Sequence, residues 1–121
     1  MYILQKICYD VHVSIDYITF IEVIILEEIW KDVVGYEGRY MVSNLGNIKS
    51  VIFKRKGKEQ TLSLLEGKDY LLVRLYKNGV GSMQRVHRLV AEAFIENPNN
   101  YPVVNHKNWN RHDNRADNLE W

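Results

Sequence analysis

The residues with the clearest chemical potential begin at Asn105 and His106. Six further Asn, His and Asp side chains follow within the next twelve residues: Asn108, Asn110, His112, Asp113, Asn114 and Asn118. Such side chains offer amide and carboxylate oxygens and imidazole nitrogens to a ligand. Asn and Asp also favour turns, because they bond nearby backbone and tolerate left-handed geometry. The stretch is therefore either a functional site or a surface loop capped by its own amides.

Two hairpins and a helix are predicted ahead of this stretch. The first hairpin joins Tyr40–Ser43 to Asn47–Ser50 through Asn44-Leu45-Gly46, where Asn and Gly tolerate a tight turn. The second joins Tyr70–Tyr76 to roughly Ser82–Val86, with apolar and mixed residues alternating along its first strand.

The period then changes to that of a helix. Leu89, Val90, Ala93 and Phe94 fall at helical spacing within 87–94, and Glu96-Asn97-Pro98 closes the helix. A strand beginning at Val103 leads into Asn105 and His106, and another is expected from Leu119 to Trp121. Hairpins, one helix and a strand–loop–strand unit predict an α+β fold.

Composition sets broad limits on the class of protein. The chain has 121 residues and is 46 % hydrophobic, which suits one compact domain or two small modules. Its single cysteine, Cys8, excludes an internal disulfide and a cysteine-rich zinc knuckle. Residues 1–27 carry one Lys against four acidic residues, a net charge of −3. The remainder carries 15 Lys and Arg against 11 Asp and Glu, a net charge of +4, which is compatible with a phosphate-rich partner.

The N-terminal residues match no motif. The apolar run from Tyr17 to Leu26 is interrupted by Glu22 and is about half as long as a membrane helix. Asp10 and Asp16 also exclude an uninterrupted signal-peptide core. The run suits a buried strand or a short core helix, and periodicity does not decide between them. Composition changes near Glu27 and Glu28, so we divide the chain into residues 1–27, an unassigned extension, residues 28–58 and residues 59–121.

Two motif sets resemble a known family. In the first set, the segment Val86–Phe94 resembles the helix that precedes the hairpin of HNH nucleases. The residues that follow keep the order of that family's core: Pro98, Pro102, Val104-Asn105-His106, Asn114 and Asn118-Leu119-Glu120-Trp121. The second set lies upstream and looks like the NUMOD4 motif: Glu28–Asp32, Gly35–Gly38, Tyr40 and Val42–Gly46. The resemblance covers roughly residues 28–121, with a NUMOD4-like β module at 28–58 and an HNH-like core at 59–121.

This resemblance implies a metal-dependent DNA endonuclease with a ββα-metal core. His106 would be the general base, a role that suits histidine because imidazole titrates near neutral pH. Asn105 would be a ligand of one Mg²⁺ or Mn²⁺ ion, since these hard cations take oxygen ligands. Asn118 would orient the base by a hydrogen bond, and Asn114 would brace the loop. Family members continue past Trp121 into a helix with a second metal ligand, so we expect this final helix to be missing.

The implied partner is double-stranded DNA. Arg88 could bind phosphate through its guanidinium fork or could brace the fold, and the sequence does not choose between these roles. A basic run supplies the other candidate contacts with the DNA backbone: Lys49, Lys54, Arg55, Lys56 and Lys58. We further expect a monomer with no membrane contact and no small-molecule cofactor, in the cytoplasm of a bacterial or phage-infected host cell.

The chain departs from the family at two positions after the presumed base. Asn108 stands where Asp is usual, and Trp109 stands where Gly is common. Trp109 either distorts the loop or lies on another loop path and stacks on DNA. Two alternatives to the nuclease also remain: a non-catalytic DNA-binding remnant of an HNH endonuclease, and a structural zinc domain using His87, His106 and His112.

Overall fold

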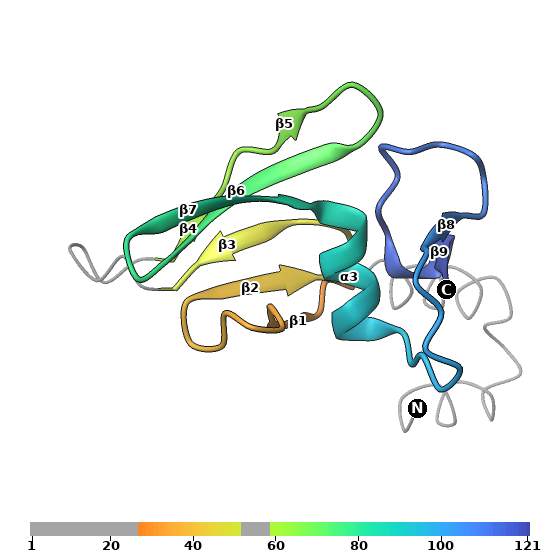
Figure 1. Cartoon of the computed structure of the whole chain (residues 1–121), viewed down its shortest axis with the longest axis horizontal. Coiled ribbons are helices and arrows are strands. Elements are labelled where there is room, and N and C mark those ends of the chain that lie inside the picture. The colour runs from red at the N-terminus through yellow and green to blue at the C-terminus, as the bar shows by residue number, and fades with distance from the viewer. Residues whose placement is uncertain (1–26, 52–58) are drawn as a thin grey trace, which may run out of the picture.

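Three small antiparallel sheets and one α-helix make up the described part of the chain, which comprises residues 27–51 and 59–121 of a computed structural model (Figure 1). This mixture confirms the α+β class. Of the predicted extension, residues 1–27, all but Glu27 lie outside the described residues, including the apolar run from Tyr17 to Leu26. Within the described residues, no helix is long and apolar enough to cross a membrane.

The first sheet contains four strands in sequence order: β1 (Trp30–Asp32), β2 (Tyr40–Ser43), β3 (Ile48–Ser50) and β4 (Gln60–Thr61). The predicted first hairpin is confirmed as β2 and β3. The short strands β1 and β4 were not predicted. Because β4 follows residue 58 and pairs with β3, this sheet takes strands from both sides of the predicted module boundary.

The second sheet contains β5 (Leu65–Glu66), β6 (Leu71–Lys77) and β7 (Val80–Arg85). Its hairpin turns at Asn78 and Gly79, whose φ angles of 54° and 78° are those of a tight hairpin turn. In β6 the side chains of Val73 and Leu75 are buried while Arg74 is exposed, which confirms the predicted alternation. Strand β5 was not predicted.

Helix α3 (Val86–Phe94) begins directly after β7 and packs against β2, β6 and β7. Its buried face carries Val86, Leu89 and Val90 at the spacing that the sequence predicted. The two sheets are joined in this core by the Tyr40 hydroxyl, which accepts a hydrogen bond from the backbone N–H of Tyr76 at 3.0 Å. The helix therefore lies over a core built from both hairpins (Figure 1).

The third sheet pairs β8 (Asn105–His106) with β9 (Leu119–Glu120), and the 3₁₀ turn η3 (Ala116–Asn118) leads into β9. The predicted strand from Val103 thus begins two residues later than expected. After β9, the Trp121 indole N–H donates to the carbonyl of Ile95 at 3.0 Å, which ties the end of this segment to the end of α3.

The turn between β2 and β3 supports the loop between β8 and β9. The N–H of Ala116 donates to the carbonyl of Asn44 at 2.7 Å. Gly46 has a φ of +91°, and a Cβ added there would lie 3.1 Å from Asn114 Cβ and 3.2 Å from the Asn114 carbonyl oxygen. Glycine is therefore needed both for the backbone conformation and for the close approach.

We expect Gly46→Ala to destabilise the protein more than Gly79→Ala. Both alanines would pay about 1–2 kcal/mol for a left-handed conformation. Only Gly46→Ala also crowds Asn114, because Gly79 has open space around its Cβ position. The added crowding should cost at least about 1 kcal/mol more. Urea denaturation of both variants measures the difference, and equal losses would show that the contact with Asn114 is loose.

Candidate active site

His106 is buried at the end of β8 and makes one short side-chain contact. Its ring is 6 % exposed, and its Nε2 atom lies 2.8 Å from the side-chain oxygen of Asn114. Because an amide oxygen only accepts hydrogen bonds, Nε2 carries the ring hydrogen in this arrangement. In the neutral ring, the other nitrogen, Nδ1, then keeps its lone pair and can accept a proton.

Asn114 is itself buried, at 4 % exposure, and lies against Gly46. Among the described residues, its Nδ2 group has no hydrogen-bond partner, so its only side-chain hydrogen bond in this set is the one with His106. Burying an amide with one end unpaired is costly, and in native structures such groups call for an explanation. Here the explanation is that the amide oxygen is held against the histidine.

Asn118 braces the loop instead of the base. Its Nδ2 group donates to Asn108 Oδ1 and to the carbonyl of Asp113, both at 2.9 Å, and its Oδ1 atom accepts from the N–H of Asn108 at 3.1 Å. We expected Asn118 to bond the base and Asn114 to brace the loop, and the contacts are the reverse. The reason is that Asn118 directly precedes β9, where its amide faces the backbone of the loop.

Charged residues reinforce the same loop. Asp113 accepts two hydrogen bonds from Arg115, at 2.9 and 3.1 Å, and one from Asn108 at 2.8 Å. These bonds, first of all those from Arg115, hold the pKa of Asp113 below its ordinary value. Asn110 adds a turn by accepting from the N–H of His112 at 3.0 Å. Much of the Asn-rich stretch is therefore a self-capped loop, and Asn114 is the residue that turns toward the histidine.

Asn105 lies on the other side of the β8–β9 ribbon. It is exposed, and its Nδ2 group donates to Glu120 Oε1 at 2.9 Å. Successive side chains of a strand point to opposite faces, so Asn105 shares a face with Glu120, while His106 lies on the face of Leu119. The structure thus does not bring the side chains of Asn105 and His106 together.

A cluster of rings connects His106 to a second buried histidine. His87, in the first turn of α3, is tilted against His106 with ring centroids 5.1 Å apart, and it stacks on Tyr70 at 4.6 Å. Burial lowers the pKa of His87 to about 4, and electrostatic interactions with His106, Arg85 and Arg88 lower it further. His87 is therefore neutral at physiological pH.

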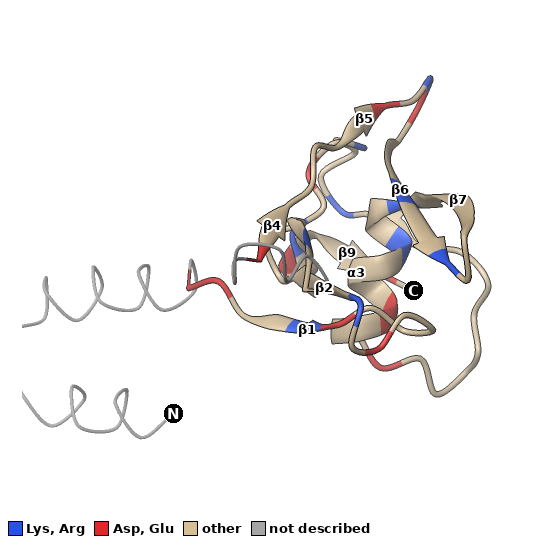
Figure 2. Cartoon of the chain, turned by 90° about the vertical axis from the view of Figure 1, so that its left-hand side faces the viewer, with Lys and Arg blue, Asp and Glu red and all other residues tan. Residues whose placement is uncertain are grey.

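The candidate DNA contacts fall in different environments, among Lys, Arg, Asp and Glu that are interspersed over the described residues (Figure 2). Lys49 pairs with Glu59 at 2.7 Å and lies over the Trp30 ring, and its side chain is only 16 % exposed. Arg88 donates to the carbonyl of Pro102 at 2.8 Å, which favours the bracing role. The remaining candidates lie outside the described residues: Lys54, Arg55, Lys56 and Lys58.

Two loop residues are presented to solvent. Trp109 is 92 % exposed and has a φ of +66°, the left-handed conformation in which glycine is common. The loop therefore keeps a glycine-type turn even though the residue is bulky. His112 is exposed. The described residues contain no group of three His, Cys, Asp or Glu that could hold a metal, so the predicted zinc set of His87, His106 and His112 is not assembled.

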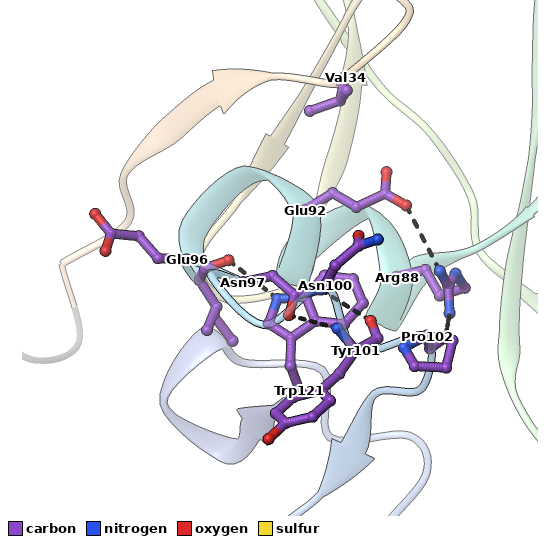
Figure 3. A pocket seen from close by; sticks show the side chains of 10 residues that line it. Val34, Arg88, Glu92, Glu96, Asn97, Asn100, Tyr101, Pro102 and Trp121 are labelled. Atoms are coloured by element: carbon purple, nitrogen blue, oxygen red, sulfur yellow. Dashed lines mark hydrogen bonds and ion pairs between the residues drawn. The ribbon is translucent and has the colours of Figure 1, made fainter.

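A hollow lies beside the end of α3, and neither His106 nor Asn114 lines it (Figure 3). It has a volume of about 560 Å³ and is lined by polar groups that pair with one another. Asn97 exchanges two hydrogen bonds of 2.8 Å with the backbone of Tyr101, and Arg88 and Trp121 bond backbone carbonyls. These contacts brace the path from α3 to β8.

Comparison with known proteins shows to which proteins the chain is related. The NUMOD4 motif model matches residues 28–76. The chain is 44 % identical over 93 residues to the DNA endonuclease I-HmuI of Bacillus phage SP01, a match that covers 76 % of this chain and 51 % of that protein. The chain carries a NUMOD4 motif and is a homologue of HNH endonucleases.

Two further matches support this relationship. An uncharacterized HNH endonuclease of Acanthamoeba polyphaga mimivirus is 42 % identical over 99 residues, covering 78 % of this HNH homologue and 23 % of the viral protein. A solved structure of the HNH homing endonuclease I-HmuI, which concerns its DNA binding and cleavage, matches this chain with a TM-score of 0.67 at 42 % identity. That match covers 77 % of this chain and 51 % of the solved chain. The chain thus spans about half the length of I-HmuI and about a quarter of the mimivirus relative.

Three residues near His106 of this HNH homologue were not predicted from the sequence. Tyr70 stacks on His87, and both Arg85 and Arg111 place a guanidinium group on the Tyr70 ring. Arg85 and His87 are close in sequence, and this clustering of polar residues at a helix start was a usable signal. The contact between Tyr70 and Arg111 joins the turn before β6 to the loop between β8 and β9, and no local pattern predicts it.

The buried His87 should make stability depend on pH. Its pKa is near 6.5 in the unfolded chain and about 4 in the folded one, so as pH falls the unfolded chain takes up the proton first. Stability should therefore decrease as pH falls from about 6.5 to about 4, by up to roughly 3 kcal/mol. His87→Phe keeps a ring for stacking and should remove much of this loss in urea denaturation at several pH values. His112→Gln, at an exposed position, is the control and should behave as wild type; an equal loss in His87→Phe would contradict the assignment.

Proposed function

We propose that this chain carries the nuclease site of an HNH homing-type endonuclease and hydrolyses phosphodiester bonds of double-stranded DNA with His106 as general base. The supporting observation is the 2.8 Å contact between His106 Nε2 and Asn114 Oδ1 within a buried setting. It directs the ring so that Nδ1 can accept a proton, which a base needs. The homologues named as HNH endonucleases, one of them a DNA-cleaving phage enzyme, make DNA the substrate to test.

In this proposal, His106 takes a proton from the attacking water at Nδ1 while Asn114 holds the protonated Nε2. Once Nδ1 is protonated the ring carries a positive charge, and the Asn114 oxygen stabilises that charge through the same hydrogen bond. Tyr70 and His87 limit rotation of the ring by packing beside it. His87 is neutral, so it adds no charge that would oppose protonation of the base.

The residues present fit part of a site for Mg²⁺ or Mn²⁺. The Asn105 amide nitrogen is engaged by Glu120, which leaves its Oδ1 atom as a neutral oxygen ligand beside a carboxylate. Such cations commonly keep several waters and bind one or two protein oxygens together with substrate phosphates. Asn105 would hold the ion in this way, and the ion would stabilise negative charge on the phosphate during hydrolysis. The ββα-metal form of the core belongs to the same proposal.

The test is nicking of supercoiled plasmid by the purified chain, in Mg²⁺ or Mn²⁺ and in EDTA. We expect metal-dependent nicking that falls at least about 10²-fold in His106→Ala, since general base catalysis contributes roughly 10²–10⁴-fold. His112→Ala removes an exposed histidine from the same loop and should nick as wild type. DNA binding in a gel should persist in both variants.

The other outcomes separate the competing functions. Nicking by His106→Ala at the wild-type rate would contradict the assignment of the base. A folded wild-type chain that shifts DNA in a gel but never nicks it would support the alternative, a non-catalytic DNA-binding remnant. Nicking that persists undiminished in EDTA would contradict the proposed cation.

A further inference from the structure

Two exposed arginines meet on one aromatic ring beside the base. The guanidinium carbon of Arg85 lies 5.6 Å from the centre of the Tyr70 ring, and that of Arg111 lies 5.4 Å from it. These arginines come from different elements, the end of β7 and the loop between β8 and β9. The same Tyr70 ring lies 6.1 Å from the His106 ring, centroid to centroid. The pair is thus held next to the proposed reaction centre.

The charges around this ring are unbalanced toward the positive. Among the described residues at this ring and the hollow beside it, Lys68, Arg85 and Arg111 are basic and Asp69 is acidic, with its Oδ1 atom 3.0 Å from Arg111. Arg85 is exposed, and the Arg111 side chain is 55 % exposed, so both can reach a ligand from solvent. Residues 67–70, Leu72 and Arg85 line a hollow of about 220 Å³ at the turn between β5 and β6. This turn and the β8–β9 loop lie side by side (Figure 1).

The geometry points to a phosphate clamp: Arg85 and Arg111, ordered on Tyr70, bind backbone phosphates of the DNA strand that passes His106. Guanidinium groups bind phosphate in a planar fork and stack on aromatic faces, so the ring holds them in place before DNA arrives. Lys49 and Arg88 are held differently: the Lys49 side chain is only 16 % exposed beside Glu59, and Arg88 donates to the backbone carbonyl of Pro102. This inference rests on the proposed function for its substrate, but its test does not depend on cleavage.

The test is the salt dependence of DNA binding, measured by fluorescence anisotropy in EDTA with a short labelled duplex of arbitrary sequence. Removing one arginine that binds a phosphate should reduce the slope of log affinity against log salt by about 0.9. The double variant Arg85→Ala/Arg111→Ala should therefore lower the slope by about 1.8. Lys77→Ala removes one charge at the other end of β6, about 20 Å from Tyr70, and should leave the slope unchanged. Circular dichroism and thermal unfolding confirm that each variant is folded.

Asp69→Asn tests the clamp in the opposite direction. Asp69 competes with phosphate for Arg111, so its neutralisation should tighten binding to the duplex by several-fold. If the ion pair between Arg111 and Asp69 were only structural, its removal would leave DNA affinity unchanged or lower it. Glu37→Gln removes an exposed carboxylate from the turn before β2 and is the matched control, with no expected gain.

The clamp and the nuclease proposal fail separately. A slope unchanged in the double variant, or an Asp69→Asn variant that binds no tighter than wild type, would overturn the clamp even if the chain nicks DNA. A reduced slope in the double variant, together with a wild-type slope in His106→Ala, supports the clamp even if no nicking occurs. An equal reduction of the slope in Lys77→Ala would overturn it by showing that the contribution is spread over the surface.

Discussion

The hydrogen bond between His106 and Asn114 is the interaction on which the site depends. A buried imidazole has two different nitrogens, and only a fixed partner decides which of them carries the hydrogen. Asn114 supplies that partner at 2.8 Å, from a position where its own amide nitrogen has no partner among the described residues. Burial of the unpaired Asn114 amide nitrogen is unfavourable, but the same placement lets the amide oxygen fix the hydrogen of the neutral His106 ring on Nε2. The proposed chemistry requires this arrangement.

The rest of the described fold holds these two residues in place. The turn between β2 and β3 approaches Asn114 so closely that a Cβ at position 46 would crowd it, and the carbonyl of Asn44 anchors the same loop at Ala116. Helix α3 supplies His87 on the other side. The NUMOD4 motif, which covers residues 28–76, therefore contributes the turn that supports the proposed nuclease loop. The NUMOD4 motif and the HNH-like segment therefore share one hydrophobic core.

The sequence predicted the parts of the fold that local patterns control. The β2–β3 hairpin, the β6–β7 hairpin and α3 follow from alternation, helical spacing and turns that contain Asn and Gly. All three lie close to their predicted positions. Strands β1, β4 and β5 have two or three residues each and owe their pairing to neighbours, so no local pattern marks them. The residue types of the site were predictable for the same reason, whereas the partners were not. Asn114 and Asn118 are chemically identical, and only the three-dimensional path of the loop decides which one faces His106.

The most direct test of this account is the tautomer of His106. Long-range ¹H–¹⁵N correlation spectra of the ¹⁵N-labelled protein at neutral pH distinguish a protonated ring nitrogen from an unprotonated one, and His106→Gln assigns the signals. We expect His106 to carry its hydrogen on Nε2, and we expect Asn114→Ala to disturb this preference while the control Asn110→Ala leaves it intact. A ring protonated on Nδ1, or a tautomer that does not respond to Asn114→Ala, would contradict the central claim.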